Sequence, residues 1–344
     1  MPSTSNRALI AAAGSGKTEQ VVAEALGATG SVLVLTYTNE NHRHILSRLR
    51  EAEGTVPSNI RVRTWFDFLV NEGARPYQIA MELEPGALGT LNFLGRRNRS
   101  MSKASLAYYL DEDNDLYRDG VADFVCSCNK RSGGRVVSRL EAIYSKILID
   151  EFQDLVGYDL DLIDLLLAAA IPVTLVGDPR QRTFVTNLNP RNKQYQGAGI
   201  MNWLDERKTV CATEVLSESF RCCQELCDFS DSLYPDLPKT TGRNVDNDEH
   251  RGIRIIEAGE VAEYVAKWQP MILRDSKATN TAGLPAMNIG VAKGLTFERV
   301  LIFPTAPMMK YLDERDLSGL KPQSIARLYV AVTRARHSVT FVRK

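Results

Sequence analysis

The 344-residue sequence has no excess of charge of either sign and no long hydrophobic run. Its 42 Lys and Arg residues balance 42 Asp and Glu residues, so the formal net charge is zero. This balance excludes a strongly basic nucleic-acid scavenger, although it leaves room for one local basic groove. No apolar run approaches the ~20 residues that a membrane-spanning helix needs. We therefore expect a cytoplasmic protein without a membrane partner, long enough for two domains.

Cysteine and histidine are also scarce, with six and four residues. No cysteines have the paired C-x-x-C spacing of a zinc site, and no histidine lies close to them in the sequence. Reduced, partly buried thiols are therefore expected, and a metal site remains the alternative. The cysteines are Cys126, Cys128, Cys211, Cys222, Cys223 and Cys227.

The segment Arg7 to Thr18, RALIAAAGSGKT, has the spacing of a phosphate-binding P-loop, with Ala11 in place of the usual first glycine. An apolar run precedes the small residues and a helix-compatible run follows them, as a strand–loop–helix unit requires. Backbone N–H groups can wrap phosphate oxygens, Lys17 can reach the β- and γ-phosphates, and Thr18 can offer its hydroxyl to Mg²⁺. The alternative is a small-residue turn beside a chance lysine. The predicted nucleotide-binding residues are Ala13, Gly14, Ser15, Gly16, Lys17 and Thr18.

An acidic pair, Asp150 and Glu151, ends the apolar run KILID and is followed by Gln153 and Asp154. A carboxylate at this position can hold Mg²⁺ through water, which is the role we assign to Asp150. Glu151 can orient and deprotonate the attacking water. The sequence therefore predicts hydrolysis of the bound nucleotide and not binding alone.

Short apolar runs alternate with helix-compatible segments, which predicts an α/β fold with parallel sheets. A second α/β unit is expected to start near Val210. Strand signals vanish between 71 and 139, so we expect a mostly helical insertion there. One loop of this insertion is basic and could contact phosphates or simply be solvated. Its basic residues are Arg96, Arg97, Arg99 and Lys103. The expected strands are 31–36, 59–64, 146–150, 172–176, 253–258, 270–274, 287–290, 299–304 and 338–342.

Stabilising the transferred phosphoryl group requires positive charge and hydrogen-bond donors at fixed positions. Gln181 follows the expected strand 172–176, and it is one candidate. Arg221 in SESFRC and Arg334 in YVAVTRAR are the others. Because both arginines fall in the second α/β unit, we expect a site that closes between two domains.

Eight segments, in order, resemble the motifs of UvrD/Rep-type superfamily 1 DNA helicases. They are AAAGSGKT, VLTYTN, VRTWFDFL, ILIDEFQD, LVGDPRQ, LSESFRC, VAKGLTFERVLI and LYVAVTRAR. The resemblance implies two RecA-like P-loop domains that clamp ATP and Mg²⁺ and move 3′→5′ on single-stranded DNA. It places the first domain at 1–70 and 140–208, a small helical insertion at 71–139, and the second domain at 209–344.

The same resemblance implies roles for individual residues. Gln181 resembles the γ-phosphate sensor, Arg221 and Arg334 resemble arginine fingers, and Arg274 resembles an arginine near the nucleotide. Tyr37 resembles the aromatic residue that stacks on a base, a contact worth ~1–3 kcal/mol. The further candidates for DNA contact are Asn39, Thr64, Trp65 and Phe184, of which the two aromatic residues could equally be core.

Departures from the family pattern predict a reduced motor with weak duplex unwinding. Gly290 and Thr296 replace the usual His and Glu, and a loop at 187–199 replaces the usual run after Gln181. The spacing from Arg221 to Asn288 is too short for the family's large helical insertion. The segment SFRCCQELCDFS also resembles the helicase-like subunit of Gabija-type anti-phage systems, which acts with a nuclease partner. The alternative function is therefore a nucleotide-switched, DNA-sensing regulatory subunit of a nuclease or other antiviral effector.

Overall fold

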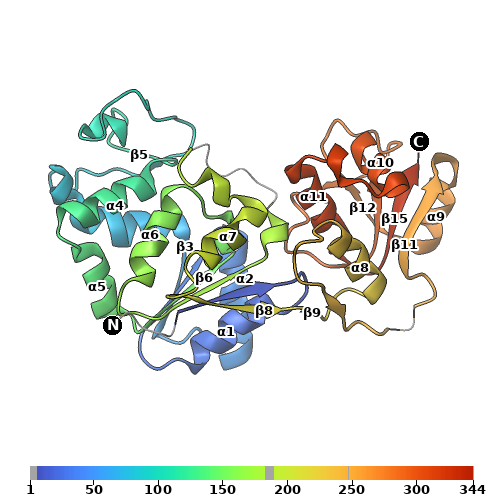
Figure 1. The fold of residues 1–344 in the computed structure, drawn as a ribbon, viewed down its shortest axis with the longest axis horizontal. Helices are drawn as coiled ribbons and strands as arrows, with labels where there is room; N and C mark the ends of the chain where they lie inside the picture. The colour runs from blue at the N-terminus through green and yellow to red at the C-terminus, as the bar shows by residue number, and fades with distance from the viewer. Residues whose placement is uncertain (1–5, 183–189, 247, 344) are drawn as a thin grey trace. The chain divides into compact units, whose positions relative to one another are not determined.

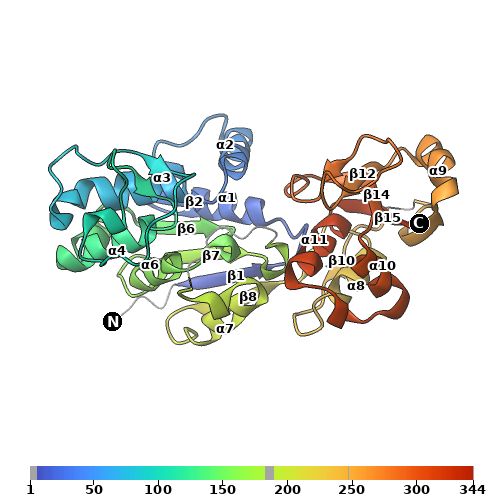
Figure 2. The ribbon, with the colours of Figure 1, turned by 90° about the horizontal axis from the view of Figure 1, so that it is seen from above.

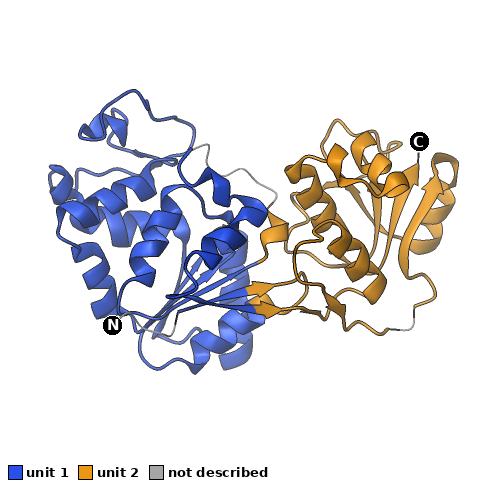
Figure 3. Ribbon diagram, viewed as in Figure 1, with its two compact units in different colours: residues 1–9, 18–177, 186–214 blue, residues 10–17, 178–185, 215–344 orange. Residues whose placement is uncertain are grey.

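The computed structural model describes residues 6–182, 190–246 and 248–343. The chain divides into two compact units (Figure 3). The first unit comprises 1–9, 18–177 and 186–214, and the second comprises 10–17, 178–185 and 215–344. The P-loop residues 10–17 therefore belong by their contacts to the second unit. The fold is α/β with two parallel sheets, as the sequence predicts.

The larger sheet has six strands in the order β3-β2-β6-β7-β1-β8. Figure 2 shows this order from β2 to β8. The pairs β2–β3, β2–β6 and β6–β7 are parallel. All five residues of β2 are buried, as expected for a central strand covered on both faces. The strands are β1 (Arg7–Ala11), β2 (Val32–Thr36), β3 (Ile60–Thr64), β6 (Lys146–Asp150), β7 (Val173–Gly177) and β8 (Ala212–Leu216).

The helices that follow these strands begin and end with local signals. The Thr38 side chain accepts a hydrogen bond from the Asn41 N–H and caps α2, and Gly54 ends that helix at a φ of 74°. The helices are α1 (Lys17–Gly27), α2 (Asn39–Glu53), α3 (Trp65–Phe68), α4 (Val121–Arg131), α5 (Arg135–Ile143), α6 (Tyr158–Leu167) and α7 (Ile200–Asp205).

The expected strands of this sheet lie within one residue of the observed ones at both ends, and KILID matches β6 in full. Strand β8 lies next to β1 in this sheet, although a second α/β unit was expected to start near Val210. Four of its five residues are exposed. An edge strand of this kind lacks the apolar pattern by which the other strands are recognised.

The stretch 71–139 is less purely helical than expected. It includes most of a π-helix (Leu69–Ala74), a 3₁₀-helix (Arg75–Met81), α4 and α5. It also holds a parallel pair, β4 (Leu91–Asn92) with β5 (Leu116–Tyr117). Two-residue strands are too short to produce a period that the sequence could reveal.

One residue of the basic loop in this stretch, Arg97, does not face solvent. Its side chain is 1% exposed and forms ion pairs with Asp119 at 3.3 Å and Asp123 at 3.1 Å. Arg97 is therefore internal, and it fits neither alternative raised for the loop. Arg96 and Arg99 are exposed.

The second sheet has the order β11-β15-β14-β12-β13, and its neighbouring strands are parallel. One face packs on α8, α10 and α11 through side chains such as Ile302 and Phe341, and the other packs on α9 through Leu301 and Val342. Alternate residues of the strands thus supply two apolar layers. The elements are β9 (Glu218–Ser219), α8 (Gln224–Ser232), β10 (Thr241–Gly242), β11 (Gly252–Glu257), α9 (Val261–Trp268), β12 (Met271–Arg274), β13 (Met287–Asn288), β14 (Phe297–Phe303), α10 (Ala306–Glu314), α11 (Pro322–Val332) and β15 (Ala335–Arg343).

The cysteines are free thiols, and all except Cys126 are buried. In the described parts of the chain, no group of three or more His, Cys, Asp or Glu side chains is arranged to hold a metal ion. Within the same residues, no helix combines the length and the apolar character that crossing a membrane requires.

Candidate active site

The P-loop leaves β1 at Ala11 and enters α1 at Lys17. Gly14 and Gly16 have φ angles of 78° and 80°, in the left-handed region that favours glycine. The Lys17 ammonium lies 3.4 Å from the carbonyl oxygens of Ala11 and Ala12, so its side chain folds back over the loop. This turn directs backbone N–H groups and the start of a helix towards the same space, an arrangement suited to phosphate.

The segment 216–221 packs directly on the P-loop. The Ser219 hydroxyl donates to the Ala13 carbonyl at 2.7 Å, and the Phe220 N–H donates to the Gly14 carbonyl at 2.9 Å. A Cβ atom added to Gly14 would lie 2.6 Å from the Arg221 Cβ. Arg221, predicted from sequence as an arginine finger, therefore lies beside the phosphate-binding turn.

Tyr329 of α11 connects the P-loop to the end of β7. Its hydroxyl accepts a hydrogen bond from the Ala13 N–H at 3.3 Å and donates one to the Asp178 carboxylate at 3.0 Å. Burial and the neighbouring carboxylate raise the pKa of Tyr329, so the hydroxyl keeps its proton. The tyrosine thus occupies one of the N–H groups that a P-loop offers to phosphate.

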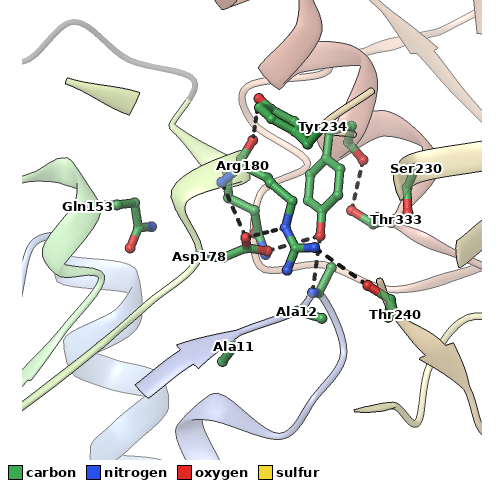
Figure 4. Close-up of polar contacts among 12 residues, drawn as sticks. Ala11, Ala12, Gln153, Asp178, Arg180, Ser230, Tyr234, Thr240 and Thr333 are labelled. Carbon is green, nitrogen blue, oxygen red and sulfur yellow. Dashed lines mark hydrogen bonds and ion pairs between the residues drawn. The ribbon is translucent and has the colours of Figure 1, made fainter. Parts of the chain in front are cut away.

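Asp178 is fully buried and is the centre of this network (Figure 4). It accepts hydrogen bonds from the Arg180 Nε at 2.8 Å and the Gln181 side-chain amide at 2.9 Å. Burial by itself raises the pKa of Asp178. The charges of Arg180 and Lys17, together with these hydrogen bonds, outweigh burial and lower the pKa below its ordinary value. The carboxylate therefore stays ionised and can orient several donors at once.

Arg334 reaches the same network from the end of α11. It is 2% exposed, and its guanidinium donates to the Gln181 side-chain oxygen at 3.3 Å. The Arg221 guanidinium donates to the Thr333 carbonyl at 3.0 Å, one residue away in the chain. The structure therefore brings together Lys17, Gln181, Arg221 and Arg334, four residues singled out from sequence as candidates for catalysis.

Thr18, Asp150 and Glu151 lie in the first unit. Asp150 ends β6 and is 5% exposed. Glu151 has a φ of 56°, which is uncommon for a residue other than glycine, and it accepts a hydrogen bond from the Gln153 side chain. Backbone conformations of this kind are costly and concentrate at functional sites. The geometry is therefore compatible with the roles predicted for the acidic pair.

Comparison with known proteins gives one family match. Residues 92–185 match the model of the UvrD/REP helicase N-terminal domain. The matched stretch contains ILIDEFQD and LVGDPRQ and begins after the P-loop. No curated protein matches the chain.

Two solved structures of an arterivirus helicase, nonstructural protein 10, are similar to the chain in fold. One is 16% identical with a TM-score of 0.51, and it aligns with 99% of this chain and 60% of its own length. The other, the same helicase in complex with DNA, is 16% identical with a TM-score of 0.52 and coverages of 99% and 61%. This chain therefore spans about three fifths of the helicase chains that it matches. Neither the family match nor these structures support the resemblance to a Gabija-type subunit.

Arg274 ends β12, and its Nε donates to the Asn288 side-chain oxygen at 3.0 Å, across the parallel β12–β13 pair. Its assignment to the nucleotide stays a prediction. Two further network residues, Asp178 and Tyr329, were not singled out from sequence. Both fall inside segments that resemble helicase motifs, LVGDPRQ and LYVAVTRAR. Their position in these segments is the sequence signal by which they could have been found.

The predicted DNA-contact residues that the structure describes lie in the first unit. Tyr37 is half-buried after β2, and Asn39 is exposed at the start of α2. The Thr64 hydroxyl accepts from the Asp67 N–H and so caps α3. Trp65 is 1% exposed and donates to Asp159 at 2.8 Å, which favours the alternative that it is core. The fifth candidate, Phe184, lies outside the described residues.

Proposed function

We propose that this protein is an ATP-dependent translocase on single-stranded DNA, with 3′→5′ polarity and weak duplex unwinding of its own. The observation that supports this function best is the polar network around the P-loop. It joins Lys17, Gln181, Arg221 and Arg334, which belong to four separate motif-like segments of the chain. A nucleotide-binding protein that only stored or transported a nucleotide would need no such convergence of guanidinium groups.

In the proposed reaction, the P-loop N–H groups and Lys17 bind the phosphates. Arg221 and Arg334 neutralise charge on the transferred phosphoryl group, and Gln181 senses its presence. Glu151 accepts a proton from the attacking water. In this scheme, each of these polar side chains acts on a group whose charge changes during hydrolysis.

The proposal includes Mg²⁺, for which Thr18 and Asp150 are the candidate ligands. A hydroxyl and a carboxylate are the hard oxygen donors that this ion prefers, and both residues lie in the same unit. When bound, Mg²⁺ neutralises phosphate charge. The residues present therefore fit the ion.

Single-stranded DNA is the proposed substrate of the motor. The structural neighbour in complex with DNA supports this choice by fold, and half-buried Tyr37 supports it by chemistry, since an aromatic ring after a parallel strand can stack on a base of any identity. A net charge of zero is compatible with the proposal because the contacts come from a local surface.

The decisive experiment is an ATPase titration with single-stranded oligonucleotides. We expect DNA to raise the ATPase rate many-fold. Lys17→Ala should abolish activity through loss of phosphate binding, and Glu151→Gln should abolish turnover while ATP still binds. Slow turnover that does not respond to DNA would refute the motor function and favour the regulatory alternative.

A further inference from the structure

Three aromatic side chains in the first unit form a continuous series, which we call the aromatic row: Tyr37, Phe66 and Phe93. The Tyr37 and Phe66 ring centroids are 5.6 Å apart, and those of Phe66 and Phe93 are 5.8 Å apart. The rings come from three separate segments, namely the residue after β2, the short helix α3 and the residue after β4. The row therefore extends from a predicted DNA contact into the insertion at 71–139.

The outer end of the aromatic row is exposed although it is apolar. Phe93 is 55% exposed and Leu94 is 97% exposed. Exposing two consecutive large apolar side chains costs free energy, and exposed apolar patches commonly mark a binding surface. The patch is also held in place, because the Asn92 side chain accepts hydrogen bonds from the N–H groups of Leu94 and Gly95 at 3.1 and 2.5 Å.

A cation lies beside the row. Strands β4 and β5 are parallel, so Phe93 and Arg118, which follow them, emerge at the same end of the pair. Figure 1 shows β5 in the first unit, above α4. The Arg118 N–H donates to the Asn92 carbonyl at 3.1 Å. Arg118, Tyr37 and Phe66 line one pocket. Among the residues that the structure describes, Arg118 forms no ion pair, so its charge is available to an anionic ligand.

Carboxylates at the same pocket have other partners. Asp119 forms ion pairs with Arg97 and Arg99 at 3.3 and 3.2 Å. Asp159 accepts hydrogen bonds from the Trp65 indole and from the Val156 N–H. Asp119 is therefore paired with two arginines, whereas Asp159 is held by neutral donors, and Arg118 is a cation of the pocket lining that can pair with a phosphate.

A fourth ring adds aromatic character to this surface. Tyr158 lines the pocket, with the Lys103 ammonium 4.2 Å and the Arg191 guanidinium 5.2 Å from its ring centroid. These two cations also form ion pairs with Asp123 at 3.0 Å and Asp161 at 2.6 Å. Aromatic rings interleaved with cations are the combination by which proteins hold single-stranded nucleic acid without reading its sequence.

We infer that the aromatic row, extended by Phe93 and flanked by Arg118, binds successive bases and a phosphate of single-stranded nucleic acid. The inference rests on the proposed function and deepens it, because it assigns a nucleic-acid-binding role to the insertion. Bases stack on the exposed faces of the rings, and Arg118 pairs with the backbone between them.

Oligonucleotide binding measured by anisotropy with fluorescein-labelled oligo(dT) tests the inference. We expect Phe93→Ala to weaken binding about 5- to 150-fold, since one stacked base is lost. The matched control is Ile79→Ala, which removes another exposed apolar side chain, 67% exposed, from the same insertion. Arg118→Gln should reduce the slope of log affinity against log salt by about 0.7, the value for one phosphate contact on a single strand.

Two further variants separate stacking from general apolar contact. Phe93→Trp should keep the affinity, and the fluorescence of the introduced indole should be quenched by oligo(dT). Phe93→Leu keeps apolar area without a ring, so it should bind as weakly as Phe93→Ala. Full affinity of Phe93→Leu would overturn the inference and favour an apolar protein partner.

The outcomes also separate this inference from the proposed function. If Tyr37→Ala weakens DNA binding while Phe93→Ala binds like Ile79→Ala, the role of the insertion is refuted and the motor function stands. If the unaltered protein neither binds oligo(dT) nor responds to it in ATPase assays, both are refuted.

Discussion

At the scale of single residues, Gly14 is a closely packed point of the candidate active site. Its φ of 78° disfavours other residues, and an added Cβ would lie 2.6 Å from the Arg221 Cβ and 2.7 Å from the Ser219 hydroxyl. The two constraints differ in kind. The first concerns the backbone of the loop alone, whereas the second concerns the packing of the arginine-bearing segment on that loop.

We predict that Gly14→Ala lowers ATPase activity strongly, because the new methyl group displaces Arg221 from the P-loop. Gly54→Ala is the matched control, since Gly54 has a similar φ of 74° and open space around its Cβ position. Both variants should lose about 1 kcal/mol of unfolding free energy from backbone strain. Steady-state ATPase assays and chemical denaturation measure the two effects, and equal ATPase loss in both variants would contradict the prediction.

At the scale of elements, α11 carries the groups that connect the P-loop to the segment after β7. Tyr329 bonds to Ala13 and Asp178 from within the helix, and Arg334 follows two residues after its end. Because one group lies in α11 and the other closely follows it, a shift of the helix would move both. The helix is therefore a candidate for transmitting the state of the nucleotide site to the second sheet.

We predict that Tyr329→Phe lowers the KM for ATP and also lowers kcat. Loss of the hydroxyl frees the Ala13 N–H for phosphate, so nucleotide binding no longer competes with tyrosine, and it removes the link to Asp178. The change in KM and the change in kcat each correspond to the loss of one hydrogen bond of about 0.5–1.5 kcal/mol, or roughly 2- to 10-fold. Initial-rate measurements over a range of ATP concentrations give both constants.

Tyr234→Phe provides the control for this prediction. Tyr234 packs on Tyr329 with ring centroids 5.7 Å apart, and its hydroxyl donates to the Arg180 carbonyl instead of contacting the P-loop. This variant should leave the KM for ATP unchanged. An equal change of KM in both variants would indicate a general packing effect and not competition at Ala13.

At the scale of the whole molecule, the chain aligns with only part of the helicase chains that it resembles in fold. It spans about three fifths of the arterivirus helicase chains that it matches. Between Arg221 and Asn288, the described residues form α8 and α9 and no further α-helix. The large helical insertion of UvrD/Rep-type helicases therefore has no counterpart among these residues, and this observation is the basis of the weak duplex unwinding that we propose.

We predict movement along single strands without efficient duplex unwinding. Streptavidin should be displaced from a 5′-biotinylated oligonucleotide, as 3′→5′ movement requires, and a 3′-biotinylated oligonucleotide is the matched control. Unwinding of a 3′-tailed duplex should be much slower than this displacement, and Glu151→Gln should do neither. Displacement from the 3′ end alone would contradict the proposed polarity.

Much of the fold could be predicted because its signals are local. The buried strands β2, β6 and β7 show continuous apolar runs, since both faces of a central parallel strand are covered. Strand β8 and the short pair β4–β5 escaped prediction. An exposed edge strand carries little apolar pattern, and a two-residue strand carries none.

By itself, the sequence determined the α/β class, the P-loop, the acidic pair and the candidates Gln181, Arg221 and Arg334, because each depends on residue type and spacing along the chain. Only the tertiary structure decided that Tyr329 connects Ala13 to Asp178, that Trp65 is core and that Phe93 continues the ring series from Tyr37. These features join residues distant in the sequence, and hydrogen bonding, burial and ring contact arise when the chain packs.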